Sequence, residues 1–139
     1  EKWASVGYLT GYSKAENVEN RIADAFDPNS GTIEHRAKSY LEINCAHCHR
    51  REGSANNSGL FLLLKEQNPE SWGMMKSPVA AGAASGDDLY DIVPSKPDES
   101  ILVHRITDND PEVRMPELGR SVQHVEGVAL IRQWITEMK

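Results

Sequence analysis

The stretch Cys45-Ala46-His47-Cys48-His49 decides the fold of this chain of 139 residues. It contains the only two cysteines of the sequence, three positions apart, and a histidine follows the second one directly. Two cysteines cannot make the disulfide framework of a small stapled domain. A structural zinc site normally needs four protein ligands, and the sequence has no second cysteine pair to complete one. A thiol–disulfide site is expected beside a β-α-β pattern, and no such pattern is visible.

The pattern Cys-x-x-Cys-His is the attachment sequence of c-type haem. Each thiol adds across one vinyl group of the porphyrin, and the three-residue spacing brings both sulfurs to one edge of the ring. The next residue, His49, then lies under the iron and supplies its imidazole as the proximal ligand. The sequence therefore predicts one haem c attached through Cys45 and Cys48, and His47 is expected to face solvent.

A helix is predicted from Thr32 to Ile43, directly before the motif. Thr32 is its candidate N-cap. Four apolar residues share one face of this helix, namely Ile33, Ala37, Tyr40 and Leu41. After the motif, residues 50–59 are predicted to form a loop. The apolar run Leu60 to Glu66 is too short for its periodicity to separate helix from strand.

Residues 67–94 contain many prolines and glycines and are predicted to be mostly irregular. A loop of this length in a compact domain is usually functional or wrapped around something. Helices are predicted over Pro97–Ile106 and Val125–Met138, with a loop over Asp108–Gly119 between them. Pro97 favours a helix start, because its fixed φ suits the first helical position.

Two further helices are predicted near the start of the chain, over Lys2–Leu9 and Ala15–Phe26, the second with Ser13 as its N-cap. The turn-rich stretch 27–31 ends this region. No segment shows the strict alternation of a β-sandwich. We therefore predict an all-α fold in which helices and long irregular loops wrap around a covalently bound haem.

The net charge of −6 argues against a nucleic-acid binder, which normally has a basic surface. The longest apolar runs are too short for a transmembrane helix, so no direct membrane insertion is expected. No leader pattern opens the sequence, and we expect any signal peptide to have been removed. We interpret the excess of acidic over basic residues mainly as a source of solubility. The alternative interpretation is a surface that matches a partner with a basic docking face.

Met115 is the preferred second axial ligand of the iron. It lies in the loop between two predicted helices, and Pro116 stiffens the chain that presents its sulfur. The competing candidates are Met74, Met75, Met138, His35, His104 and His124. Ligation by His49 and Met115 raises the reduction potential and leaves no open site, which makes electron transfer the expected function. The alternative is a haem-based peroxidase or a gas or redox sensor with a displaceable distal ligand.

The haem propionates need hydrogen-bond donors. Arg51 and Arg114 are the candidates, because a guanidinium pairs with a carboxylate through two parallel hydrogen bonds. Trp72 and Tyr90 are weaker candidates. The apolar residues expected to line the haem pocket are Leu60, Leu62, Leu64, Ile92, Val93, Ile101, Leu102, Leu118 and Trp134.

Residues 33–138 resemble class I mono-haem c-type cytochromes. In that family a helix leads into Cys-x-x-Cys-His, a methionine ligand follows in a late loop, and a C-terminal helix packs against the rest. The matching stretches are Arg36-Ala37-Lys38-Ser39-Tyr40-Leu41, Asn44-Cys45-Ala46-His47-Cys48-His49, Ser100-Ile101-Leu102-Val103-His104-Arg105-Ile106, Arg114-Met115-Pro116-Glu117-Leu118-Gly119 and Gly127-Val128-Ala129-Leu130-Ile131-Arg132-Gln133-Trp134-Ile135.

The resemblance implies a cytochrome c domain over residues 31–139 and an N-terminal extension over residues 1–30. It is nearest to cytochrome modules appended to larger secreted bacterial proteins, either carbohydrate-active or dehydrogenase-like. It therefore implies a module of a longer multidomain protein in a periplasmic, outer-membrane-attached or secreted setting. The implied partner is another redox protein, for example a secreted oxidoreductase such as a copper polysaccharide monooxygenase.

Overall fold

The computed structural model describes residues 2–12 and 21–139, and its regular structure is almost entirely helical. The elements are α1 (Lys2–Ser5), α2 (Ile33–Cys45), α3 (Ile101–Thr107), α4 (Val125–Glu137) and three short 3₁₀ turns, η1 (Asn56–Ser58), η2 (Gly82–Ser85) and η3 (Pro97–Glu99). Within the described residues, β-structure is limited to two isolated bridges, Met74 to Ile92 and Tyr90 to Ser100. The chain is thus helical with almost no strand, which agrees with the predicted all-α class.

Helix α2 begins where the sequence predicts. The backbone N–H of His35 donates to Oγ1 of Thr32 at 3.2 Å, which confirms Thr32 as the N-cap. Ala37 and Leu41 on its apolar face are fully buried. The helix continues two residues beyond the predicted end and includes Cys45.

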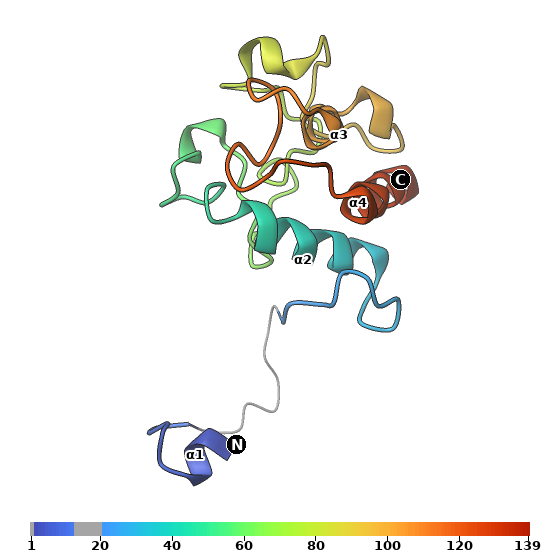
Figure 1. Cartoon of the computed structure of the whole chain (residues 1–139). Coiled ribbons are helices and arrows are strands. Elements are labelled where there is room, and N and C mark those ends of the chain that lie inside the picture. Colours follow the sequence, from blue (N-terminus) through green and yellow to red (C-terminus); the bar gives the residue numbers. More distant parts are fainter. Residues whose placement is uncertain (1, 13–20) are drawn as a thin grey trace.

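Helix α4 packs against both α2 and α3, and Figure 1 shows it lying between them. Its apolar face is the centre of the core, with Ile131 and Ile135 completely buried. Gly127 allows a close approach to α2, because a Cβ at this position would lie 2.2 Å from Oη of Tyr40. The predicted helix Val125–Met138 is confirmed, except that Met138 caps it.

The predicted helix Pro97–Ile106 is wrong as a single element. It is divided into η3 and α3, because Ser100 between them is extended, with φ −111° and ψ 119°. The Ser100 hydroxyl donates to the carbonyl of Lys96 and accepts the N–H of Val93, both at 2.9 Å. This buried side chain offers the backbone hydrogen bonds that a continuous helix would otherwise supply.

Predictions near the start of the chain are corrected. The helix predicted over Lys2–Leu9 ends at Ser5. Of the helix predicted over Ala15–Phe26, residues 15–20 and the N-cap Ser13 lie outside the described part, and residues 21–26 are not helical. The backbone N–H of Ala23 donates instead to Oγ of Ser39 at 3.0 Å, so this segment packs on α2. The domain boundary at residue 30 stays a prediction.

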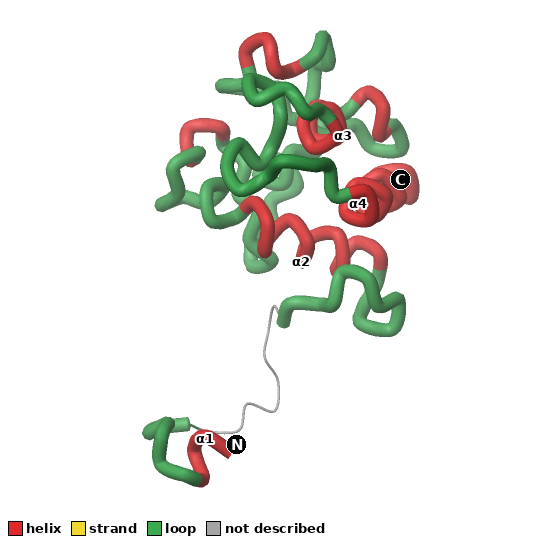
Figure 2. The backbone as a smooth tube through the Cα atoms, viewed as in Figure 1, coloured by secondary structure: helices red, strands yellow, loops and turns green. Residues whose placement is uncertain are grey.

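The long central segment 67–94 is mostly irregular, as predicted, apart from η2 and the bridged residues. Figure 2 shows how much of the domain consists of such loops. Trp72 anchors this segment, since its ring is buried and its Nε1 donates to the Glu66 carbonyl at 3.0 Å. The indole N–H of Trp72 is therefore already used within the protein.

The apolar run Leu60 to Glu66 forms neither helix nor strand.

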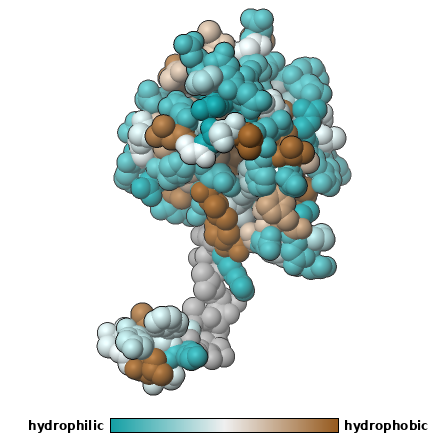
Figure 3. Space-filling view, in the orientation of Figure 1, coloured by the Kyte–Doolittle hydropathy of each residue, from teal (hydrophilic) through white to brown (hydrophobic). Residues whose placement is uncertain are grey.

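The visible face of the molecule is largely polar, with apolar side chains in small separate patches (Figure 3). Exposed apolar residues of the domain include Phe26, Ile43, Leu118, Val122 and Val125. None of the helices formed by residues 2–12 and 21–139 combines the length and apolarity needed to cross a bilayer.

Candidate functional site

The motif lies at the C-terminal end of α2. Cys45 is the last helical residue, and its carbonyl accepts the N–H groups of Cys48 at 3.1 Å and His49 at 2.9 Å. Both thiols are free and half-buried, whereas His47 is exposed as predicted. The turn therefore keeps both sulfurs and the His49 ring at the end of one helix.

The hydrogen bonds of His49 fix its tautomer. Nδ1 of the ring lies 3.2 Å from Oγ of Ser58, and the same hydroxyl lies 2.7 Å from the carbonyl of Ala55. A carbonyl can only accept, so the single Ser58 proton points to Ala55, and the hydroxyl accepts a proton from Nδ1. Nε2 of His49 then carries the lone pair, and no described residue makes a hydrogen bond to it. This is the arrangement found for imidazoles that bind a metal through Nε2.

The loop after the motif folds back onto the Cys48 carbonyl. This oxygen accepts the N–H groups of Arg50 at 3.1 Å and Ala55 at 3.2 Å. Gly53 passes so close that a Cβ there would lie 2.0 Å from the same oxygen. Gly53 therefore has to be a glycine for the loop that carries Ser58 to reach His49.

The Cys45 thiol is a weak acid in this structure. Burial and, to a smaller extent, the neighbouring charge of Cys48 together raise the pKa of Cys45 to about 12. Thiol–disulfide enzymes need a lowered thiol pKa, so the surroundings of Cys45 do not favour that alternative. The described residues also contain no group of three or more His, Cys, Asp or Glu side chains placed to hold a metal ion. The zinc alternative therefore finds no ligand set among them.

Two charged residues near Met115, Arg105 and Glu117, act on the His49 ring. The backbone N–H of Met115, a half-buried residue, donates to the Arg105 carbonyl at 2.9 Å. Burial lowers the pKa of His49, and the positive charges of Arg105 and His47 lower it further, whereas Glu117 opposes them. Charges on both sides of Met115 therefore act on the His49 ring.

The competing axial candidates have other surroundings. Met74 packs against the apolar core and Met75 is exposed. Nε2 of His35 lies 2.8 Å from the Arg21 carbonyl, and Nδ1 of His124 lies 3.0 Å from Oη of Tyr40. These two rings have partners of their own within the protein.

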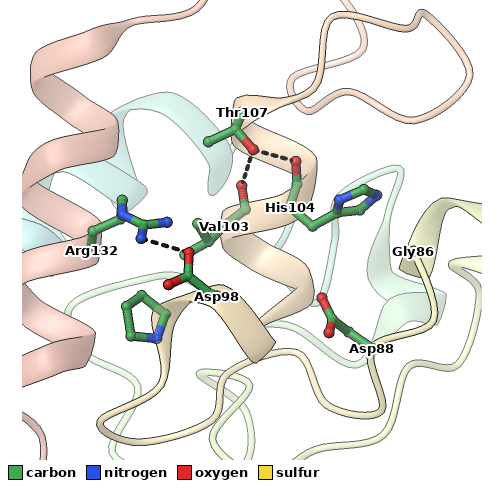
Figure 4. Close-up of a pocket in the computed structure, with 8 residues that line it drawn as sticks. Gly86, Asp88, Asp98, Val103, His104, Thr107 and Arg132 are labelled. Atoms are coloured by element: carbon green, nitrogen blue, oxygen red, sulfur yellow. Dashed lines mark hydrogen bonds and ion pairs between the residues drawn. The ribbon is translucent and has the colours of Figure 1, made fainter.

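His104 lines a separate polar pocket of about 270 Å³ between η3, α3 and α4. Figure 4 shows Asp88 beside the His104 ring and, across the pocket, Arg132 paired with Asp98 at 2.6 Å. None of the motif residues lines this pocket.

The two arginines proposed for the propionates differ. Arg51 already has a carboxylate partner, Glu66 at 3.2 Å, and its guanidinium lies 4.5 Å from the ring centroid of Phe61. Nε of Arg114 is buried and has no hydrogen-bond partner among the described residues. A buried donor without a partner is costly, so Arg114 fits an acceptor that is not part of the chain.

The residues expected to line the pocket fall into three groups by their exposure. Four of them are buried in the protein core, namely Leu62, Ile92, Ile101 and Trp134. Leu118 is 87% exposed and does not contribute to that core. Leu60, Leu64, Val93 and Leu102 are half-buried.

The structure adds three residues that the sequence analysis did not select, Gly53, Ser58 and Arg120. Glycines and serines are common in loops, and nothing in the local sequence separates these two from their neighbours. Arg120 donates to the Met115 carbonyl at 2.6 Å. Its proximity to Met115 in sequence was the one available signal.

Comparisons with protein-family models, with curated proteins and with solved structures give no significant match to this chain. A function can thus be argued only from the residues and their geometry.

Proposed function

We propose that this chain is a mono-haem c-type cytochrome that transfers single electrons, with His49 and Met115 as the axial ligands and Cys45 and Cys48 as the attachment points. The arrangement at the end of α2 carries the proposal. Two half-buried thiols are followed by an imidazole whose Nδ1 proton goes to Ser58 and whose Nε2 is free. A donor set of this kind fits a covalently held haem better than it fits zinc or a thiol–disulfide couple.

Haem c supplies a one-electron iron couple when it is bound. His49 would donate Nε2 to the metal, and Ser58 would keep its ring in place. The thioether of Met115 favours the ferrous state and so raises the reduction potential. With His49 and Met115 both holding the iron, no site would be left for oxygen or peroxide, and electron transfer would be favoured over catalysis. Arg114 would donate its buried Nε to a propionate.

The order of elements supports the finer assignment to a class I cytochrome c fold. Helix α2 leads into the motif, the Met115 loop separates α3 from α4, and α4 packs across α2. Such a module would work in a periplasmic, outer-membrane-attached or secreted setting, because c-type haem is attached outside the cytoplasm. Its partner would be another redox protein, with a secreted copper polysaccharide monooxygenase as one example.

The direct test is a pyridine haemochrome spectrum of the chain produced in a bacterium that matures c-type cytochromes. We expect the spectrum of a haem with both vinyl groups saturated. Cys48→Ser is the matched control, because it leaves one thioether and should shift the spectrum toward that of a haem with one free vinyl. A wild-type chain without covalent haem under these conditions would exclude the proposal.

A further inference from the structure

The half-buried side chain of Arg120 binds the loop that carries Met115. All three nitrogens of its guanidinium donate, and together they reach five acceptors, one on α3 and four on the chain between α3 and α4. The acceptors are the carbonyls of Met115 at 2.6 Å, Asp108 at 2.6 Å, Val122 at 3.3 Å and Arg105 at 3.4 Å, and Oδ1 of Asn109 at 3.4 Å.

These bonds leave Met115 held at both of its peptide groups. Its N–H donates to the Arg105 carbonyl at 2.9 Å, and its carbonyl accepts from Arg120. Arg105 adds a second brace, since its Nε donates to the Val113 carbonyl at 2.9 Å. The described chain between α3 and α4 has no helix or strand, so side-chain donors replace the hydrogen bonds that regular structure would provide.

Arg120 also acts electrostatically on α2. Its positive charge lowers the pKa of Tyr40, against the larger raising effect of burial and of the Cys45 thiol. Tyr40 in turn holds His124, at the start of α4, through a 3.0 Å hydrogen bond. The charge of Arg120 thus acts both on the Met115 loop, through its hydrogen bonds, and on the helix that carries the first cysteine.

We propose that Arg120 is a positioning residue that keeps the Met115 sulfur in place for iron, an inference that rests on the proposed function. A thioether is a weak ligand, so ligation depends on a loop that is ordered before the bond forms. The planar guanidinium can bridge the Met115 and Asp108 carbonyls at the same time. A lysine ammonium in the same place is a compact point charge and cannot span both.

The test uses the haem-loaded chain with Arg120→Lys and Arg120→Gln. Three properties are measured, namely covalent haem, the weak sulfur-to-iron band of the oxidised protein, and the affinity of added imidazole, which competes with Met115. We expect covalent haem to be retained and the band to weaken or to disappear at a lower alkaline pH. Imidazole should bind about tenfold more tightly, the effect of losing one hydrogen bond from a charged donor.

A double-mutant cycle separates positioning from general destabilisation. With Met115→Ala already present, Arg120→Lys should no longer change imidazole affinity, because the competing ligand is gone. Arg132→Gln is the matched control for losing a surface arginine and should leave band and affinity unchanged. Arg120→Lys with wild-type band, pH dependence and imidazole affinity would overturn the inference, as would an equal effect in the Met115→Ala background. A wild type without covalent haem would instead contradict the proposed function.

Discussion

The two sides of the candidate site are built in different ways. On the motif side, backbone groups do most of the work, since Cys48 accepts two N–H groups of the following loop and Cys45 accepts that of His49. On the methionine side, the guanidinium of Arg120 binds the loop carbonyls. A backbone-held loop tolerates most substitutions except where space is lacking, whereas a side-chain-held loop depends on a few residues, here Arg120 and Arg105.

A buried ion pair connects the two sides. Lys76 Nζ lies 3.2 Å from Oδ2 of Asp91, and both side chains are at most one-tenth exposed. The Lys76 side chain also packs on Gly59 beside Ser58, whereas the charge of Arg105 acts on Asp91. Substitutions at this pair should therefore affect both sides at once.

The largest effect is expected for Lys76→Met, which leaves the buried Asp91 carboxylate without its partner. Loss of one member of a buried pair costs about 3–5 kcal/mol of unfolding free energy. Lys96→Met is the matched control, because the exposed Lys96–Glu99 pair should contribute less than about 1 kcal/mol. Denaturant titration of both variants at neutral pH checks the difference, and equal costs would contradict it.

The same variant has a predicted pH dependence. Burial raises the pKa of Asp91 above 3.8, and Lys76 opposes the rise, so removal of Lys76 should raise it further. A carboxyl whose folded pKa exceeds its unfolded pKa stabilises the fold below the unfolded value and loses this contribution as pH rises through the folded one. Lys76→Met should therefore lie closer to wild type near pH 4 than at neutral pH. A deficit that grows on acidification would contradict this sign.

Gly53→Ala and Gly119→Ala together compare the motif loop with the Met115 loop. The new Cβ would clash with the Cys48 carbonyl, so the loop must move and we expect a cost of about 3 kcal/mol. Gly119→Ala on the methionine side meets no atom within 4 Å and adds only the strain of φ +75°, about 1 kcal/mol. Denaturant titration gives both costs, and covalent haem content should fall only for Gly53→Ala. A larger cost for Gly119→Ala than for Gly53→Ala would contradict the close approach of Gly53 to the Cys48 carbonyl.

Met115→Ala tests the axial ligand. We expect loss of the sulfur-to-iron band and a fall in reduction potential on the order of 0.1 V, because a thioether favours ferrous iron. Met75→Ala is the control, since Met75 is exposed and should leave both properties unchanged. Potentiometry with absorption spectroscopy makes the measurement. A band that persists in Met115→Ala and disappears in Met75→Ala would transfer the role to Met75.

The smallest effect is expected for Ser58→Ala, with the opposite sign. Without an acceptor at Nδ1, His49 becomes a weaker donor to iron, so ferric iron is less stabilised. The potential should rise by no more than about 59 mV, the change that corresponds to a tenfold shift in the equilibrium. Ser58→Thr keeps the hydroxyl and should remain near wild type. A fall in potential for Ser58→Ala would show that this hydrogen bond does not act on His49 as described.

Helices α2 and α4 could be predicted because their information is local. Thr32 and the spacing of Ala37 and Leu41 fix the start and buried face of α2, and the apolar spacing after Val125 fixes α4. The single helix predicted from Pro97 was wrong because the Ser100 side chain competes with the backbone hydrogen bonds of its neighbours. That competition depends on Val93, whose backbone N–H donates to the Ser100 hydroxyl from outside the predicted helix.

The sequence by itself determined the chemistry of the motif, since two thiols and an imidazole at fixed spacing need only one turn of chain to come together. The tertiary structure alone decided which groups surround it. Ser58 reaches His49 because Gly53 lets the loop close, and Arg120 reaches Met115 because α3 and α4 hold the ends of an irregular loop. Such contacts depend on loop paths in space, and these follow from packing rather than from local residue patterns.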